Sequence, residues 1–302
     1  MRYLTSVRYI DAVARIGSIR GAAATLAITS TALNRRILAI EEELGVPIFE
    51  RLPRGVRLNS AGELLIHYIR HQLSDLERVK SQIADLSGVR RGHVAIACSQ
   101  ALLPYFLPRQ IAAYRSEHPQ VTFGVHLRDR ADAEVALVDH AADLAIVFEP
   151  VRLADVHTLL RAPQPVCAVV GERHRLADRA MLRLGECLSH PIALPTQHYG
   201  VRHLLEVAVQ GTALRLEPAI ESDSFEFLRH CVLAESMLTF QIPIGLPEDD
   251  DLGRARRIPL DPRDVPAGVL YMGQLKGRVL PVAAARFAGQ LSSALASRYE
   301  VS

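Results

Sequence analysis

The stretch from Gly17 to Gly62 constrains this chain most, because its pattern predicts two short helices joined by a turn and followed by a hairpin. Ser18 can cap the first helix, and Thr29 or Ser30 can cap the second. The second helix repeats apolar residues with a 3.6-residue period over residues 32–44 and ends at the following glycine. This pattern predicts a helix-turn-helix, whose second helix can enter the major groove of DNA.

The other face of the second helix carries hydroxyl, amide and guanidinium groups in its first two turns, and such groups hydrogen-bond to base edges. The hairpin around Pro53 and Gly55 adds three arginines that can bind phosphates or a minor groove. Residues 1–60 hold nine arginines, no lysine and five acidic residues, a net charge of +4, whereas the other 242 residues have a net charge of −2. The predicted DNA-binding residues are Thr29, Ser30, Thr31, Asn34, Arg35, Arg36, Arg51, Arg54 and Arg57.

Residues 32–37, 41–51, 53–58 and 61–63 together resemble the signature of the LysR-type transcriptional regulators. The resemblance implies an α/β chain with an N-terminal winged helix-turn-helix, a long linker helix and a two-subdomain effector domain that resembles type 2 periplasmic binding proteins. Where that family most often has Gln-Pro and Ser, this chain has Ser30-Thr31 and Asn34, so we expect a different base preference.

Gly21 also departs from expectation, since it lies inside the first helix of the motif. A glycine there costs about 1 kcal/mol relative to alanine. The sequence gives no reason for it.

Residues 61–88 are predicted to form the linker helix, begun by a capping box over residues 60–63. Apolar residues recur from Leu65 to Leu86 at steps of three and four, a narrow seam typical of a coiled coil. We expect a second copy's helix to cover it, giving a homodimer whose recognition helices lie one turn of DNA apart, or a multiple of it. The alternative is that the seam packs on the C-terminal domain.

From residue 92 the pattern alternates between strands and helices, which predicts two βαβ-type units with parallel sheets covered by helices. By resemblance, the last strand and helix return to the first subdomain. The predicted domains are therefore the winged helix-turn-helix over 1–60, the linker helix over 61–88, and the effector domain over 92–302, divided into subdomain I (92–161 and 267–302) and subdomain II (162–266).

Ligands of open α/β sheets bind at the carboxyl ends of strands, and several predicted strand ends here carry polar groups. The resemblance implies that seven residues line the cleft between the subdomains: Ser99, Gln100, Arg128, Phe148, Thr196, His198 and Ser222. Ser99 and Thr196 can help hold an anion, with Arg128 or Arg202 supplying positive charge. We expect a small-molecule co-inducer, more often anionic, whose identity the sequence does not give, and no bound cofactor.

Other classes of function lack their motifs. There is no Gly-x-Ser-x-Gly elbow, phosphate-binding glycine-rich loop or His-Glu-x-x-His, so no enzymatic activity is predicted. The four cysteines lie far apart, which indicates buried thiols rather than a redox sensor. His67 and His71 lie one helical turn apart, but no carboxylate or thiolate is arranged beside them, so no metal site is predicted.

These patterns predict a DNA-binding transcription regulator of the LysR type whose activity a small molecule modulates. Its expected partners are double-stranded promoter DNA and further copies of itself, a tetramer by resemblance, with RNA polymerase as an additional candidate. No signal core follows Met1 and no apolar run approaches the roughly 18 residues of a membrane span, so a cytoplasmic location is expected. The alternatives are an effector-independent regulator and a solute-binding protein, which would need a signal peptide.

Overall fold

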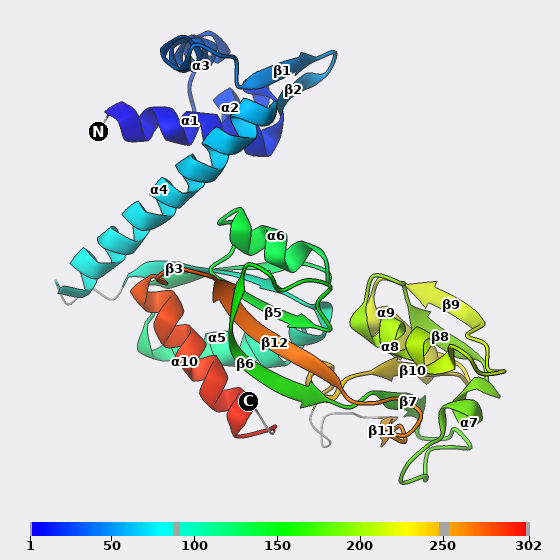
Figure 1. Cartoon of the computed structure of the whole chain (residues 1–302). Coiled ribbons are helices and arrows are strands. Elements are labelled where there is room, and N and C mark those ends of the chain that lie inside the picture. The colour runs from blue at the N-terminus through cyan, green and yellow to red at the C-terminus, as the bar shows by residue number, and fades with distance from the viewer. Residues whose placement is uncertain (1, 87–90, 248–253, 300–302) are drawn as a thin grey trace. The chain divides into compact units, whose positions relative to one another are not determined.

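The computed structural model describes residues 2–86, 91–247 and 254–299. The chain divides into an N-terminal unit, Met1–Ile83, and a C-terminal unit, Ala84–Ser302. Figure 1 shows that helices dominate the first unit and that helices and sheets alternate in the second.

The N-terminal unit is the predicted winged helix-turn-helix with its linker helix. Its elements are α1 (Arg2–Ile16), α2 (Ile19–Thr25), α3 (Ser30–Leu44), β1 (Phe49–Leu52), β2 (Gly55–Leu58) and α4 (Ser60–Leu86). Ser18 Oγ accepts a hydrogen bond from the backbone N–H of Gly21, and Thr29 Oγ1 accepts one from that of Ala32, both at 3.2 Å. α3 ends at Gly45, whose φ of +73° suits glycine. The predicted end of the linker helix at Gly88 lies outside the described residues.

Gly21 is explained by the close approach of the first two helices. A Cβ atom at this position would lie 2.9 Å from Cγ2 of Ile16, at the end of α1. Alanine would therefore require the Ile16 side chain to move or the two helices to separate, a cost that opposes the helix-propensity gain of alanine over glycine.

The start of α4 differs from the predicted capping box. The helix begins at Ser60, so Asn59 is the residue in the capping position. Asn59 Oδ1 accepts from the N–H of Gly62 at 2.9 Å, while Asn59 Nδ2 donates to the carbonyl of Pro47 at 2.8 Å. The capping-box prediction was wrong by one residue, and the side chain of Asn59 also ties the helix to the segment before the hairpin.

The apolar seam of α4 is used in two ways. Ile66 and Ile69 are buried against α1, and Leu73 packs beside them. Farther along the helix Val79 and Ile83 are 42% and 58% exposed. The first half of the seam therefore belongs to the core of its own unit, and the second half presents apolar side chains at the surface.

The C-terminal unit contains two five-stranded mixed sheets. The first has the order β4-β3-β5-β12-β6 and the second the order β11-β7-β10-β8-β9. The first sheet and its helices comprise β3 (Gly92–Cys98), α5 (Phe106–Glu117), β4 (Val121–Leu127), α6 (Asp132–Val138), β5 (Leu144–Phe148), β6 (Val156–Gln164), β12 (Gly268–Leu275) and α10 (Val282–Ala296). The second comprises β7 (Cys167–Gly171), α7 (Leu184–Leu188), β8 (Ile192–Pro195), α8 (Gly200–Val209), β9 (Pro218–Ser222), α9 (Phe225–Ala234), β10 (Leu238–Gln241) and β11 (Ala255–Pro259), and short 3₁₀ turns lie at Gln100–Leu102 and Pro243–Gly245.

The last strand and helix return to the first sheet, as the family resemblance implied. β12 lies between β5 and β6 and is antiparallel to both, and α10 packs against β3, β6 and α5 on the same half of the unit (Figure 1). Two connections, Gln164 to Cys167 and Pro259 to Gly268, join the sheets. The expected parallel sheets are mixed because β12 in the first sheet and β7 in the second run against their neighbours.

One apolar core extends through both sheets. In the first, Tyr114, Phe123 and Phe287 pack edge to face with ring centroids 4.9–5.8 Å apart. Among the described residues, no helix combines the length and hydropathy that crossing a membrane requires.

Candidate nucleic-acid interface and cleft

α3 buries one side of its first turns and exposes the polar residues of the other, on which Leu38 is also 46% exposed. Leu33 and Ile37 are buried at 0% and 3% exposure. The opposite face begins at Thr29 and is exposed at Ser30, Thr31, Arg35 and Arg36, with Asn34 half-buried beside them. The six predicted α3 residues thus form one continuous polar surface over the first two turns, where a recognition helix contacts base edges.

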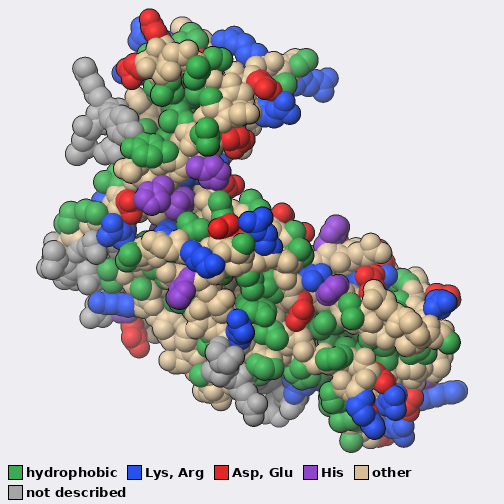
Figure 2. Space-filling model, in the orientation of Figure 1, with side chains coloured by type: hydrophobic (Ala, Val, Ile, Leu, Met, Phe, Trp, Pro, Cys, Tyr) green, Lys and Arg blue, Asp and Glu red, His purple; other side chains and the backbone are tan. Residues whose placement is uncertain are grey.

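The hairpin β1–β2 is the wing of the winged helix-turn-helix, and it carries the predicted Arg51, Arg54 and Arg57. Its register places Glu50 opposite Arg57, and their side chains form an ion pair with Nη2 2.7 Å from Oε2. The hydrogen bond to Glu50, together with its charge, raises the pKa of the Arg57 guanidinium above its ordinary value. Within the described part of the chain, Arg51 and Arg54 make no ion pair. Figure 2 shows Lys and Arg side chains gathered over this end of the N-terminal unit.

Glu41 holds the wing against α3, and sequence reasoning missed it. Its Oε1 accepts hydrogen bonds from the backbone N–H groups of Ile48 at 2.8 Å and Phe49 at 3.3 Å. The carboxylate on α3 therefore fixes the first residues of the hairpin. Its position at the start of three consecutive glutamates made it look like part of a solvated face.

The cleft residues lie where the two sheets of the C-terminal unit meet. A cavity of about 10 Å³ there, enough for about one water molecule, is lined by four of the seven predicted residues: Ser99, Gln100, Phe148 and His198. It is also lined by Asp129, Arg130, Tyr199, Gly200, Val201, Phe225 and Gln241 among others.

The other three predicted residues do not line this cavity. Arg128 Nη1 donates to the carbonyl of Leu127, its own neighbour, at 2.7 Å. Thr196 Oγ1 donates to Asp223 Oδ1 at 2.5 Å. Ser222 Oγ accepts from a backbone N–H two residues later at 3.1 Å. Each of the three side chains therefore hydrogen-bonds to a residue that does not line the cavity.

The cleft is closed by contacts between its two sides. Gln100 Nε2 donates to the carbonyl of Asp223, and Gln100 Oε1 accepts from the N–H of Phe225, both at 2.7 Å. On the first sheet's side of the cleft, Ser99 Oγ accepts from the N–H of Phe148 at the end of β5, at 3.0 Å. A Cβ at Gly200 would lie 2.7 Å from the ring of Phe148, so α8 approaches this ring as closely as only glycine permits.

Arg130, rather than the predicted Arg128, is the arginine that lines this cavity, and no pattern in the sequence distinguishes the two. Its Nε donates to the carbonyl of Glu149. Burial lowers the pKa of Arg130, while the nearby carboxylates of Glu149 and Asp129 act in the opposite direction. A partly desolvated guanidinium interacts strongly with any anion that reaches it.

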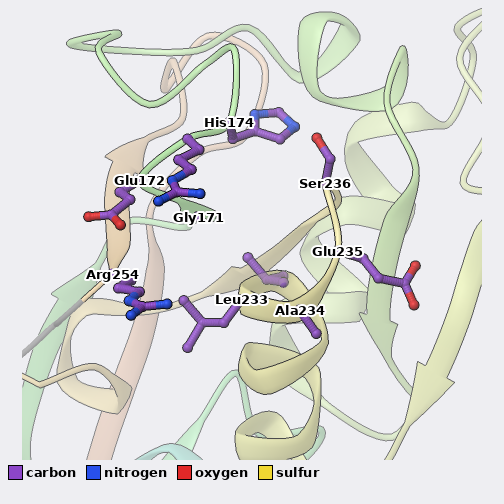
Figure 3. Close-up of a pocket in the computed structure, with 10 residues that line it drawn as sticks. Gly171, Glu172, His174, Leu233, Ala234, Glu235, Ser236 and Arg254 are labelled. Carbon is purple, nitrogen blue, oxygen red and sulfur yellow. The ribbon is translucent and has the colours of Figure 1, made fainter.

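A larger hollow of about 280 Å³ lies at the end of α9, away from the cleft residues. Figure 3 shows the His174 ring pointing toward Ser236, the Arg254 side chain pointing toward Leu233, and the Glu235 carboxylate pointing away. Cationic side chains near the carbonyls that end a helix stabilise it through the helix dipole. We assign this hollow no ligand.

The cysteines are free, and three are buried. Burial raises the pKa of Cys98 to about 12 and that of Cys167 to about 11. Cys187 has its pKa raised to about 12, again mainly by burial. These thiols stay protonated at neutral pH and are poor nucleophiles.

The chain is similar to known proteins over most of its length. Residues 4–63 match the bacterial regulatory helix-turn-helix proteins of the lysR family, and residues 87–296 match the LysR substrate binding domain. The transcriptional regulator CbbR of Sinorhizobium medicae is 27% identical over 87% of this chain and 83% of its own length.

Two solved structures show the same fold. A full-length OxyR variant from Pseudomonas aeruginosa superposes with a TM-score of 0.71 at 20% identity, covering 97% of this chain and 94% of its own. Full-length CbnR in complex with its target DNA superposes with a TM-score of 0.56 at 15% identity, covering 97% of this chain and 99% of its own.

Proposed function

Because the chain belongs to the LysR family of transcriptional regulators, we propose that it reads its operator with the exposed face of α3 in a major groove and binds neighbouring phosphates with the wing. The observation that carries this proposal is the polar surface from Thr29 to Arg36, which is exposed among the described residues of its unit except at the half-buried Asn34. Arg35 and Arg36 make no ion pair within the described residues, so their charge is available to DNA.

The test is a selection of binding sites from a pool of random DNA duplexes. The wild-type chain should enrich one consensus, and Asn34→Ala should lose preference at one position, at a cost of about 1–3 kcal/mol. Glu42→Ala, an exposed change later on the same helix, is the matched control and should keep the consensus. An identical consensus for Asn34→Ala, or no enrichment by the wild-type chain, would contradict the assignment.

We also propose that the chain assembles through α4. Val79 and Ile83 offer an exposed apolar surface to the α4 helix of a second copy. By family resemblance two such dimers form a tetramer, and RNA polymerase is a partner at the promoter.

For the cleft, we propose a small anionic effector that contacts Arg130 once the cleft opens. The proposal is supported by the placement of this guanidinium beside Ser99, Gln100 and His198. A cavity of about 10 Å³ is too small for a metabolite. Binding therefore requires the two sides of the cleft to separate, which couples occupancy to a change in shape.

Gln100→Ala should loosen this closure. The change removes both hydrogen bonds that the Gln100 side chain makes across the cleft and leaves the N–H of Phe225 without its acceptor, at a cost of about 1–2 kcal/mol. Hydrogen exchange at the Phe225 amide should accelerate roughly tenfold, measured by NMR or mass spectrometry. Gln210→Ala, an exposed change at the end of α8, should leave that rate unchanged. Equal exchange in both variants would show that Gln100 does not hold the cleft closed.

A further inference from the structure

Two histidines far apart in the sequence converge on one face of the first sheet. β3 and β4 are parallel, and their register pairs His93 with Thr122 and Ala97 with His126. A Cβ atom at Gly124, which lies between them on β4, would be 3.1 Å from Nε2 of His93 and 3.3 Å from Nε2 of His126. Both nitrogens therefore face the same small volume, which stays open because residue 124 has no side chain.

A neighbouring hydroxyl contacts the other nitrogen of one of these rings. Thr122 Oγ1 lies 3.3 Å from the carbonyl oxygen of Gly92, to which it donates, and 2.9 Å from Nδ1 of His93. In the tautomer that carries its proton on Nδ1, the ring donates to this hydroxyl. The lone pair of that ring is then on Nε2, the atom that faces the open volume. A histidine that donates through one nitrogen and binds through the other is the usual arrangement of a metal ligand.

We propose that His93 and His126 form a two-histidine site for a first-row transition-metal ion of the Zn²⁺, Ni²⁺ or Cu²⁺ type. Imidazole nitrogens bind such ions at about 2.0–2.1 Å, and the volume left by Gly124 lies within reach of both rings. The side chains of His93 on β3 and His126 on β4 are exposed, and β4 lies at the edge of its sheet. An ion can therefore enter from solvent. Mg²⁺ and Ca²⁺ prefer oxygen ligands and are not expected to bind.

The site is open rather than enclosed. Among the described residues, no group of three or more His, Cys, Asp or Glu side chains could hold a metal ion together. Water or a ligand from solution must complete the coordination. With two nitrogen ligands the affinity should follow the general order for divalent ions, with Cu²⁺ the tightest.

Strand register, not sequence spacing, creates this pair. The only histidine pair that the sequence pointed to is His67 and His71 on α4, in the other unit. That pair provides an internal control, since two histidines one helical turn apart can also bind a metal ion.

The proposal is tested by titrating the full-length, tag-free chain with Ni²⁺ and Cu²⁺ in a calorimeter. Gly124→Ala keeps both histidines but fills the volume between them, and it should weaken binding at least tenfold. His126→Asn removes one ligand and should do the same. Circular dichroism melting of each variant checks that the fold is retained, and the conservative His126→Asn change gives a result even if alanine at residue 124 disturbs the strand.

His67→Ala is the matched control and should leave the affinity unchanged. Electron paramagnetic resonance of the Cu²⁺ complex should show coupling to two imidazole nitrogens in the wild type and to fewer in His126→Asn. Unchanged affinity in both Gly124→Ala and His126→Asn, or loss of binding in His67→Ala alone, would overturn the proposal.

Discussion

Replacing both Arg51 and Arg54 with alanine is expected to weaken operator binding by about tenfold or more for each arginine lost. A charge-assisted hydrogen bond to phosphate contributes roughly 1.5–3 kcal/mol, and about 1.4 kcal/mol corresponds to a factor of ten. Each phosphate contact also releases counterions, so the slope of log affinity against log salt concentration should become shallower by about 1.8 per chain. Fluorescence anisotropy with a labelled operator at several salt concentrations measures both quantities.

Arg57→Ala is the matched control for the wing. Its guanidinium is already paired with Glu50 at 2.7 Å, so it has less charge to offer DNA. The single change should lower affinity less than loss of Arg51 or Arg54 does. If the double variant kept the wild-type salt slope, the wing would not contact phosphates.

Arg278→Ala should destabilise the C-terminal unit by about 3–5 kcal/mol, the usual cost of breaking a buried ion pair. Arg278 Nη2 lies 2.6 Å from Asp143 Oδ1, and the two side chains are only 9% and 10% exposed. Asp143 Oδ2 also accepts from the N–H of Ala95 on β3 at 2.8 Å. Without the guanidinium, the carboxylate stays buried with its charge unpaired. The chain has no tryptophan, so urea unfolding is followed by circular dichroism.

Two further variants separate the buried pair from a general effect of losing an arginine. Arg179→Ala removes a guanidinium that is 56% exposed and pairs with Glu186, which is itself 36% exposed, so it should cost less than about 1 kcal/mol. Removing both buried charges, with Asp143→Ala and Arg278→Leu together, should cost less than Arg278→Ala alone, because no unpaired charge remains. Equal losses for Arg278→Ala and Arg179→Ala would contradict the prediction.

The parts of the fold that could be predicted from the sequence are those determined by residues close together in the chain. α3 was predictable because its cap at Thr29, its apolar period and its terminal glycine all lie within 17 residues of chain. The strands β6 and β11 have weak local signals, because β6 contains Arg161 and Pro163 and β11 contains two consecutive arginines. Pairing partners far away in the chain, chiefly β12 and β7, decide that they are strands.

The same distinction applies to the sites. The residues of α3 that we propose to face DNA were predicted from helix periodicity alone, and in the structure they are exposed, apart from the half-buried Asn34. In the cleft, Ser99 and Gln100 could be predicted to line the cavity because they follow the end of a strand. Whether Arg128 or Arg130 lines it depends on the directions of the side chains after β4, which the sequence does not show. The convergence of His93 and His126 depends on strand register, which no local pattern in either segment encodes.

The two hydrogen bonds that Glu41 accepts affect how the winged helix-turn-helix can change during evolution. Glu41 holds the hairpin through backbone N–H groups at residues 48 and 49, and every amino acid except proline supplies such a group. Substitutions in the hairpin therefore leave its attachment to α3 intact. Residues that read bases and residues that bind phosphates can change in separate evolutionary steps, so new operator preferences can arise without rebuilding the scaffold that carries them.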